Sequence, residues 1–119
     1  MKAVLCLCLV LAALGGTAAA AEQFRLVGGA ELRHSARGRG VEIIVGTDRL
    51  PAISDLPEVT RRLCAEYAAA VVPSVLAQMG ATKPDFISVM IKTGTRFGAY
   101  MRIFYHFENG TCGTAIRLR

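Results

Sequence analysis

Hydrophobic residues recur at intervals of three and four between Asp55 and Gly80, a spacing that is typical of an amphipathic helix. Asp55 can act as the N-cap, Glu58 completes a capping box, and Gly80 suits the left-handed residue that ends a helix. Pro73 predicts a kink, or a break into two helices, because its ring clashes with the carbonyl group of the preceding turn. The expected core-facing stripe comprises Leu56, Val59, Leu63, Cys64, Tyr67, Ala68, Val71, Val72, Val75 and Met79.

Apolar alternation and β-branched residues predict strands on both sides of this helix. Between the first two strands, the segment from Gly28 to Gly40 is rich in glycine and polar residues, and we interpret it as a flexible basic loop. The basic residues of this loop are Arg33, His34, Arg37 and Arg39. The expected strands run from Glu22 to Val27, Val41 to Val45, Phe86 to Ile91, Phe97 to Phe107 and Thr111 to Leu118.

The Asn109-Gly110 dipeptide predicts a two-residue hairpin turn, because both central positions of such a turn need positive φ. With Glu108 opposite Thr111, the register gives an apolar face on both strands. The pairs on that face are Phe107–Cys112, Tyr105–Thr114, Ile103–Ile116 and Met101–Leu118. A five-residue turn over Lys92 to Arg96 extends the face to a third strand through Ile91–Phe97, Val89–Ala99 and Ile87–Met101.

These elements predict an α+β fold. A three-stranded C-terminal meander plus one or two N-terminal strands would form an antiparallel sheet, covered on one face by a single long Pro-kinked helix. The strand from Val41 to Val45 could lie at an edge, and its pairing stays open.

The first residues have the layout of a secretory signal: Met1-Lys2 is positive, an apolar run follows to Leu14, and Ala18 to Ala21 offers small residues for cleavage. We interpret residues 1–21 as a signal peptide and residues 22–119 as one small α+β domain of an exported bacterial protein, periplasmic or extracellular. A retained membrane anchor is the alternative. After cleavage we expect no membrane span.

Two of the four cysteines, Cys64 and Cys112, lie outside the signal peptide. In an exported chain two cysteines favour a single disulfide, and two buried free thiols are the alternative. Cys112 would point up from the sheet and Cys64 down from the helix. On the chain-entropy model, a bridge between them is worth about 4 kcal/mol, a large share of the stability of so small a domain.

The chain has 14 basic and 9 acidic residues, a net charge of +5, and loss of Lys2 leaves 13 against 9, or +4. The expected register places Arg102 opposite Arg117 on the outer sheet face. Facing arginines destabilise a sheet unless an anion lies between them, and guanidinium groups bind carboxylate or phosphate in a bidentate manner. Candidate anion- or partner-binding residues are therefore Arg102, Arg117, Arg96 and His106, with Lys92 as a further candidate. A solvated face with splayed side chains is the alternative.

Catalytic and metal-binding motifs are missing from the sequence: there is no HExxH, no phosphate-binding glycine loop, no acidic calcium loop and no zinc spacing. We predict no cofactor, no metal and no nucleic-acid partner, since export argues against the last. The leading hypothesis is a non-catalytic exported binding or accessory module for an anionic ligand or an envelope protein. The alternative is a small hydrolase with His106 as general base and an unrecognised acid.

Several short motifs lie along the back half of the chain. They are Leu63-Cys64 followed by Tyr67-Ala68, Pro84 before Ile87-Ser88-Val89, Phe97-Gly98, and Phe107 leading to Gly110-Thr111-Cys112. On these motifs, the region from Leu56 to Cys112 resembles a small family of exported alphaproteobacterial proteins whose function is unassigned. The resemblance implies a bacterial envelope location and paired cysteines, and it supplies no activity or functional residues.

Overall fold

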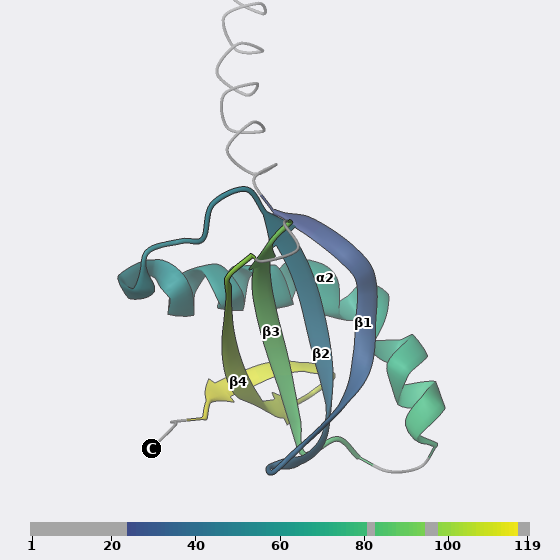
Figure 1. The fold of residues 1–119 in the computed structure, drawn as a ribbon. Helices are drawn as coiled ribbons and strands as arrows, with labels where there is room; N and C mark the ends of the chain where they lie inside the picture. Colours follow the sequence, from purple (N-terminus) through teal and green to yellow (C-terminus); the bar gives the residue numbers. More distant parts are fainter. Residues whose placement is uncertain (1–23, 81–82, 95–97, 117–119) are drawn as a thin grey trace, which may run out of the picture.

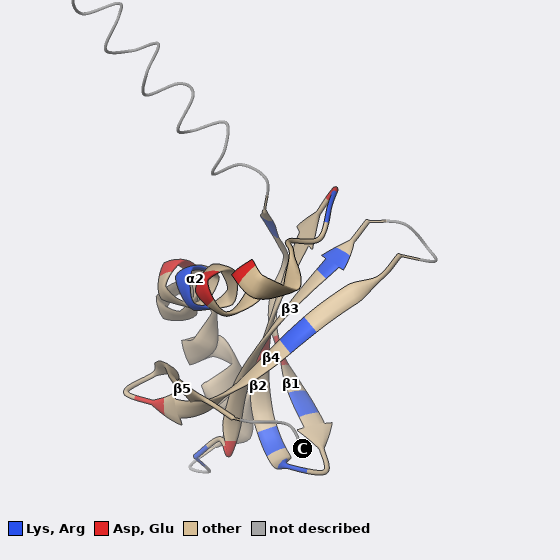
Figure 2. Cartoon of the chain, turned by 90° about the vertical axis from the view of Figure 1, so that its left-hand side faces the viewer, with Lys and Arg blue, Asp and Glu red and all other residues tan. Residues whose placement is uncertain are grey.

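The computed structural model describes residues 24–80, 83–94 and 98–116, so the expected signal peptide lies outside the described residues. Figure 1 shows a sheet with a long helix lying across one of its faces. Viewed from the side in Figure 2, helix and sheet form two layers. The elements are, in chain order, β1 (Arg25–Ser35), β2 (Gly38–Thr47), the short 3-10 helix η1 (Ile53–Asp55), α2 (Leu56–Met79), β3 (Phe86–Thr93), β4 (Tyr100–Glu108) and β5 (Thr111–Ala115).

The strands of the described residues form one five-stranded sheet in the order β1-β2-β3-β4-β5. β2 and β3 are parallel, while the other neighbouring strands are antiparallel. The α+β fold with one long covering helix is thus confirmed, but the sheet is mixed and continuous, not an antiparallel meander with one or two added strands. The reason is the connection: α2 carries the chain back across the sheet, so β3 starts at the same end as β2.

The predicted helix is confirmed as α2, and most of its expected stripe is buried, while Val59 and Tyr67 are half-buried. The expected side-chain cap is wrong: Asp55 has helical φ and ψ, and its side chain makes no capping hydrogen bond because η1 precedes the helix. Instead, the backbone N–H of Asp55 donates to the carbonyl of Ala52 at 2.9 Å. The helix is not broken at Pro73, and Figure 1 shows that its second half bends.

The expected loop from Gly28 to Gly40 is wrong, because most of this segment belongs to the β1–β2 hairpin. The register of β1 shifts between Leu26 and Ala30, where Gly28 and Gly29 have φ of 69° and 84°. These glycines therefore form an irregularity within a strand. Gly40 has a packing role, since a Cβ there would lie 2.5 Å from the ring of Phe86.

The turn at Asn109-Gly110 is confirmed, with φ of 53° and 80°, and so are the pairs Glu108–Thr111 and Phe107–Cys112. Beyond them the expected register is wrong, because Tyr105 pairs with Ala115 across a one-residue shift in β5. Consequently Phe104, and not Ile103, is the partner of Ile116, whose N–H donates to the Phe104 carbonyl at 2.8 Å. Met101–Leu118 falls outside the described residues.

The register of β3 with β4 differs from the expected one by four residues: Ile87 pairs with Tyr105, Val89 with Ile103 and Ile91 with Met101. The expected five-residue turn is therefore wrong, and the Thr93 N–H instead donates to the Ala99 carbonyl at 3.1 Å. An even shift leaves every side chain on its face, so the apolar face predicted for these strands is confirmed.

The core lies between α2 and this apolar face. The Cys64–Cys112 disulfide is confirmed, with a Cα–Cα distance of 6.3 Å, and it joins α2 to β5. Beside it, the hydroxyl groups of Thr60 and Tyr105 share a buried hydrogen bond. The buried core residues are Val41, Ile43, Val45, Leu56, Leu63, Cys64, Ala68, Val71, Val72, Val75, Met79, Ile87, Val89, Ile91 and Tyr105.

Candidate functional site

Arg102, the central residue of the predicted anion site, lies on β4 on the sheet face opposite α2. Its Nε donates to Glu42 Oε2 at 2.6 Å and its Nη2 donates to Glu42 Oε1 at 3.2 Å. Arg102 therefore holds a carboxylate in the bidentate manner expected of it, but the carboxylate belongs to its own chain.

Glu42 is fully buried, although no helix covers this face within the described residues. Its carboxylate also accepts from Ser88 Oγ at 2.8 Å and from Arg33 Nη1 at 3.4 Å. These contacts form a network that joins four strands, which we call the outer-face network. Its members are Glu42, Arg102, Arg33 and Ser88. A buried charge is tolerated because each oxygen has hydrogen-bond donors.

Aromatic rings support the arginines of this face. The guanidinium carbon of Arg102 lies 5.1 Å from the ring centroid of Tyr100, and that of Arg37 lies 5.5 Å from the centroid of Phe104. Phe104 in turn packs edge to face against Phe86, with 5.1 Å between ring centroids. Both distances are in the range of cation–π contacts, which attract these guanidinium groups to the rings.

The other predicted site residues are not gathered around Arg102 in the described structure. Arg96 and Arg117 lie outside the described residues. His106 is exposed on β4, and within the described ranges its side chain forms no hydrogen bond or ion pair. Lys92 lies on the same face as Arg102, with Tyr100 as its partner on β4. The anion site therefore stays a prediction.

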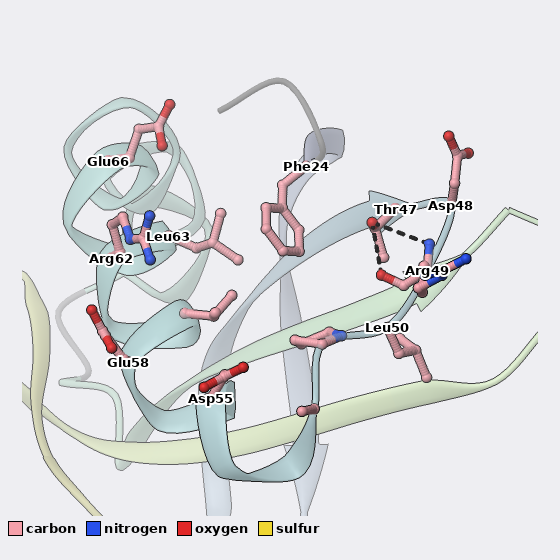
Figure 3. A pocket seen from close by; sticks show the side chains of 13 residues that line it. Phe24, Thr47, Asp48, Arg49, Leu50, Asp55, Glu58, Arg62, Leu63 and Glu66 are labelled. Carbon is pink, nitrogen blue, oxygen red and sulfur yellow. Dashed lines mark hydrogen bonds between the residues drawn. The ribbon is translucent and has the colours of Figure 1, made fainter. Parts of the chain in front are cut away.

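A cleft of about 780 Å³ lies on the helix side of the molecule, between the first half of α2, the segment from β2 to η1 and the residue before β1 (Figure 3). We call it the α2 cleft. In Figure 3, Leu63 on the helix and Phe24 face each other across it. Its lining residues are Phe24, Thr47, Asp48, Arg49, Leu50, Pro51, Ala52, Asp55, Glu58, Val59, Arg62, Leu63 and Glu66.

Local chemistry explains the two walls of the α2 cleft. The helical residues recur at spacings of three and four, which places them on one side of α2. On the other wall, Thr47 closes the turn after β2: its Oγ1 donates to the Arg49 carbonyl at 3.1 Å and accepts from the Arg49 N–H at 3.4 Å. Pro51 then leads the chain towards η1.

The rim of the α2 cleft carries four acids and two arginines, so its local balance is two negative charges on a chain of net charge +5. Asp48 forms an ion pair with Arg25 at 3.9 Å, in which both side chains are exposed. In the described part of the chain no ion pair involves the remaining rim residues, Arg49, Asp55, Glu58, Arg62 and Glu66. Figures 2 and 3 show acidic and basic residues next to each other on this half of α2.

Sequence reasoning missed this site, because Glu58, Arg62 and Glu66 lie outside the core-facing stripe that the helical spacing predicts. A usable signal was present: two glutamates lie one helical turn on either side of an arginine and next to the apolar residues Val59 and Leu63. Next to the cleft, burial raises the pKa of Tyr67, with a further contribution from the charge and hydrogen bonding of Glu66.

Comparisons with family models, with curated proteins and with solved structures gave no match to this chain. Among the described residues, no helix is both long and apolar enough to cross a membrane. Within the same ranges, His, Cys, Asp and Glu side chains form no group of three or more that is placed to hold a metal ion.

Proposed function

We propose that this protein is a non-catalytic exported binding module whose ligand lies in the α2 cleft. The observation that carries the proposal is the combination of an apolar floor, formed by Phe24, Val59 and Leu63, with a rim of charges. Its volume of about 780 Å³ falls in the usual range for ligand sites. Seven of the thirteen lining residues are polar or charged, and polar groups that converge beside an apolar floor can orient a ligand.

The outer-face network is the weaker candidate for this role. A ligand anion that took over Arg102 would leave the buried carboxylate of Glu42 without its closest donor. Separating such a pair costs about 3–5 kcal/mol, more than an exposed anion contact returns. A ligand in the α2 cleft does not have to replace an existing ion-pair partner, since most of the rim charges have none among the described residues.

Export is supported by two features. The Cys64–Cys112 disulfide is typical of oxidising compartments, and the first 21 residues have the pattern of a signal peptide. We therefore propose a bacterial envelope or extracellular location. The hydrolase hypothesis built on His106 stays a prediction, because no contact in the described structure favours it.

The test is a nuclear magnetic resonance screen of the oxidised, isotope-labelled protein against uncharged apolar fragments. We expect shift changes at Phe24, Leu50, Val59 and Leu63. Ala52→Trp should abolish them, because Ala52 is an exposed lining residue and the indole would fill the cleft. The matched control is Ala69→Trp, since Ala69 is exposed on α2 but does not line the cleft. Fragments that bind equally well to the Ala52→Trp variant would contradict the proposal.

A further inference from the structure

We infer, building on the proposed function, that the ligand of the α2 cleft is an extended peptide segment with a basic residue, an apolar residue and a second basic residue at alternate positions. The segment has the pattern Lys-x-Leu-x-Lys, with Arg acceptable for Lys. The inference rests on the spacing and the sign of the charges along α2.

Glu58 and Glu66 both line the cleft and lie eight residues apart on α2. At 1.5 Å of rise per residue, their Cα atoms are separated by about 12 Å along the helix axis. The apolar residues Val59 and Leu63 lie within that interval and form the cleft floor together with Phe24. The wall therefore presents negative charge at both ends, with the apolar residues Val59 and Leu63 and the cation Arg62 between them.

An extended peptide has the matching repeat. Its residues rise by about 3.3 Å, and every second side chain points to the same side. Positions one and five are then about 13 Å apart, and position three points to the same side between them. Two lysines at the outer positions reach Glu58 and Glu66, while leucine at the middle position meets the floor near Leu63.

Arg62 makes the pattern more specific. It lies one turn from each glutamate, and Figure 3 shows it between Glu58 and Glu66. Its positive charge disfavours a cation at the middle position of the ligand, and its N–H groups can donate to a backbone carbonyl of the extended segment. Acidic peptides face two like charges at the outer positions, so they should be rejected.

A second copy of this chain is the competing occupant, since the β1–β2 hairpin carries Arg37 and Arg39. Arg37 is stacked on Phe104, and Arg39 lies next to Asp85, whose carboxylate accepts from the Arg39 N–H at 2.9 Å. The two arginines are also only two residues apart, which is half of the expected spacing. These features favour a separate peptide over self-association.

The test titrates the oxidised, labelled protein with four capped peptides. The first is Gly-Lys-Ser-Leu-Ser-Lys-Gly, the second has Glu in place of both lysines, the third has Ser in place of leucine, and the fourth has both lysines adjacent. We expect the first peptide to shift the resonances of the cleft residues. Loss of leucine should weaken binding by about ten-fold, and adjacent lysines should weaken it by about five-fold. The Glu peptide should produce no shift.

Glu58→Gln combined with Glu66→Gln should weaken binding of the first peptide by about five-fold or more. Glu31→Gln is the matched control, because Glu31 is exposed on β1 and does not line the cleft. Equal binding of the Lys and Glu peptides, or an unchanged Kd in the double variant, would overturn the inference. So would cleft shifts that grow with protein concentration alone, which would identify a second copy as the occupant.

The two proposals fail in different ways. If uncharged fragments shift the cleft resonances and the lysine peptide does not, the inference is wrong and the binding function stands. If neither fragments nor peptides shift these resonances, both are wrong.

Discussion

Charged residues are arranged in opposite ways in the outer-face network and in the α2 cleft. In the network, Glu42 is fully buried and accepts hydrogen bonds from two arginines and a serine. At the cleft, Glu58, Arg62 and Glu66 are exposed and form no ion pair within the described residues. Both regions contain acids and arginines, so composition does not distinguish them. What differs is whether the charges are buried and form ion pairs.

This difference separates a structural role from a binding role. Moving a buried charge from its ion-pair partner to a ligand has a large free-energy cost. An exposed charge without an ion-pair partner can bind a ligand group at little cost. The hydrogen bonds of the outer-face network tie strands together, whereas the exposed charges of the α2 cleft are available for the proposed ligand.

Removal of the disulfide should have the largest effect on stability. Cys64 follows the cleft residue Leu63 and ties α2 to Cys112, 48 residues further along the chain. We expect Cys64→Ala with Cys112→Ala to lower the free energy of unfolding by about 4 kcal/mol, because the unfolded chain regains loop entropy. Urea unfolding of the oxidised wild type and of the variant measures this. A loss below about 1 kcal/mol would show that packing alone holds the cleft wall.

Glu42→Gln should come next. It removes the charge on which Arg102 and Arg33 converge and leaves the positive charges of both arginines unneutralised. We expect a loss of about 3 kcal/mol. The matched control is Glu58→Gln, whose effect should stay within about 0.5 kcal/mol because that side chain is exposed. Equal losses in the two variants would remove the distinction between the regions.

Arg102→Lys should cost about 1 kcal/mol. Lysine keeps the charge but cannot donate two parallel hydrogen bonds to Glu42, and it stacks less well on Tyr100. Lys92→Arg serves as the control on the same sheet face and should leave unfolding unchanged within error. If the lysine variant matched the wild type, a charge at this position would suffice and the bidentate geometry would be irrelevant.

The smallest effect concerns pH. Burial and Glu66 raise the pKa of Tyr67 above its ordinary value of 10.0. The unfolded chain therefore loses this proton first as the pH rises, and the stability held by the neutral phenol falls from about pH 10 upwards. Tyr67→Phe should show a shallower alkaline loss of unfolding free energy, whereas the exposed Tyr100→Phe should follow the wild type. Parallel curves for wild type and Tyr67→Phe would contradict this.

The sequence predicted the features that depend on local pattern. Helical spacing located α2, the Asn109-Gly110 dipeptide located the hairpin, and the cysteine count identified the disulfide. It failed where a distant contact decides the local structure. From the sequence alone Gly40 is typical of a loop, and only the structure shows that the ring of Phe86 packs against it. Likewise, the register of β5 shifts by one residue beyond Cys112, where Gly113 lies against Glu108.

The predicted site shows the same limit. Sequence reasoning could place Arg102 on the outer face, but it could not foresee that Glu42, sixty residues earlier, would accept hydrogen bonds from its Nε and Nη2. That pairing follows from the parallel contact of β2 with β3, which the local pattern does not encode. The α2 cleft was missed for a related reason, since its second wall comes from the segment between β2 and η1.

The division between the two regions is tested most directly by mapping where the peptide Gly-Lys-Ser-Leu-Ser-Lys-Gly shifts the amide resonances of the oxidised protein. The expected result is a set of shifts at Phe24, Leu50, Val59, Leu63 and their neighbours, with Glu42, Ser88 and Arg102 unchanged. Shifts centred on Glu42, Ser88 and Arg102, with the cleft resonances unchanged, would contradict this division and would place peptide binding at the outer-face network.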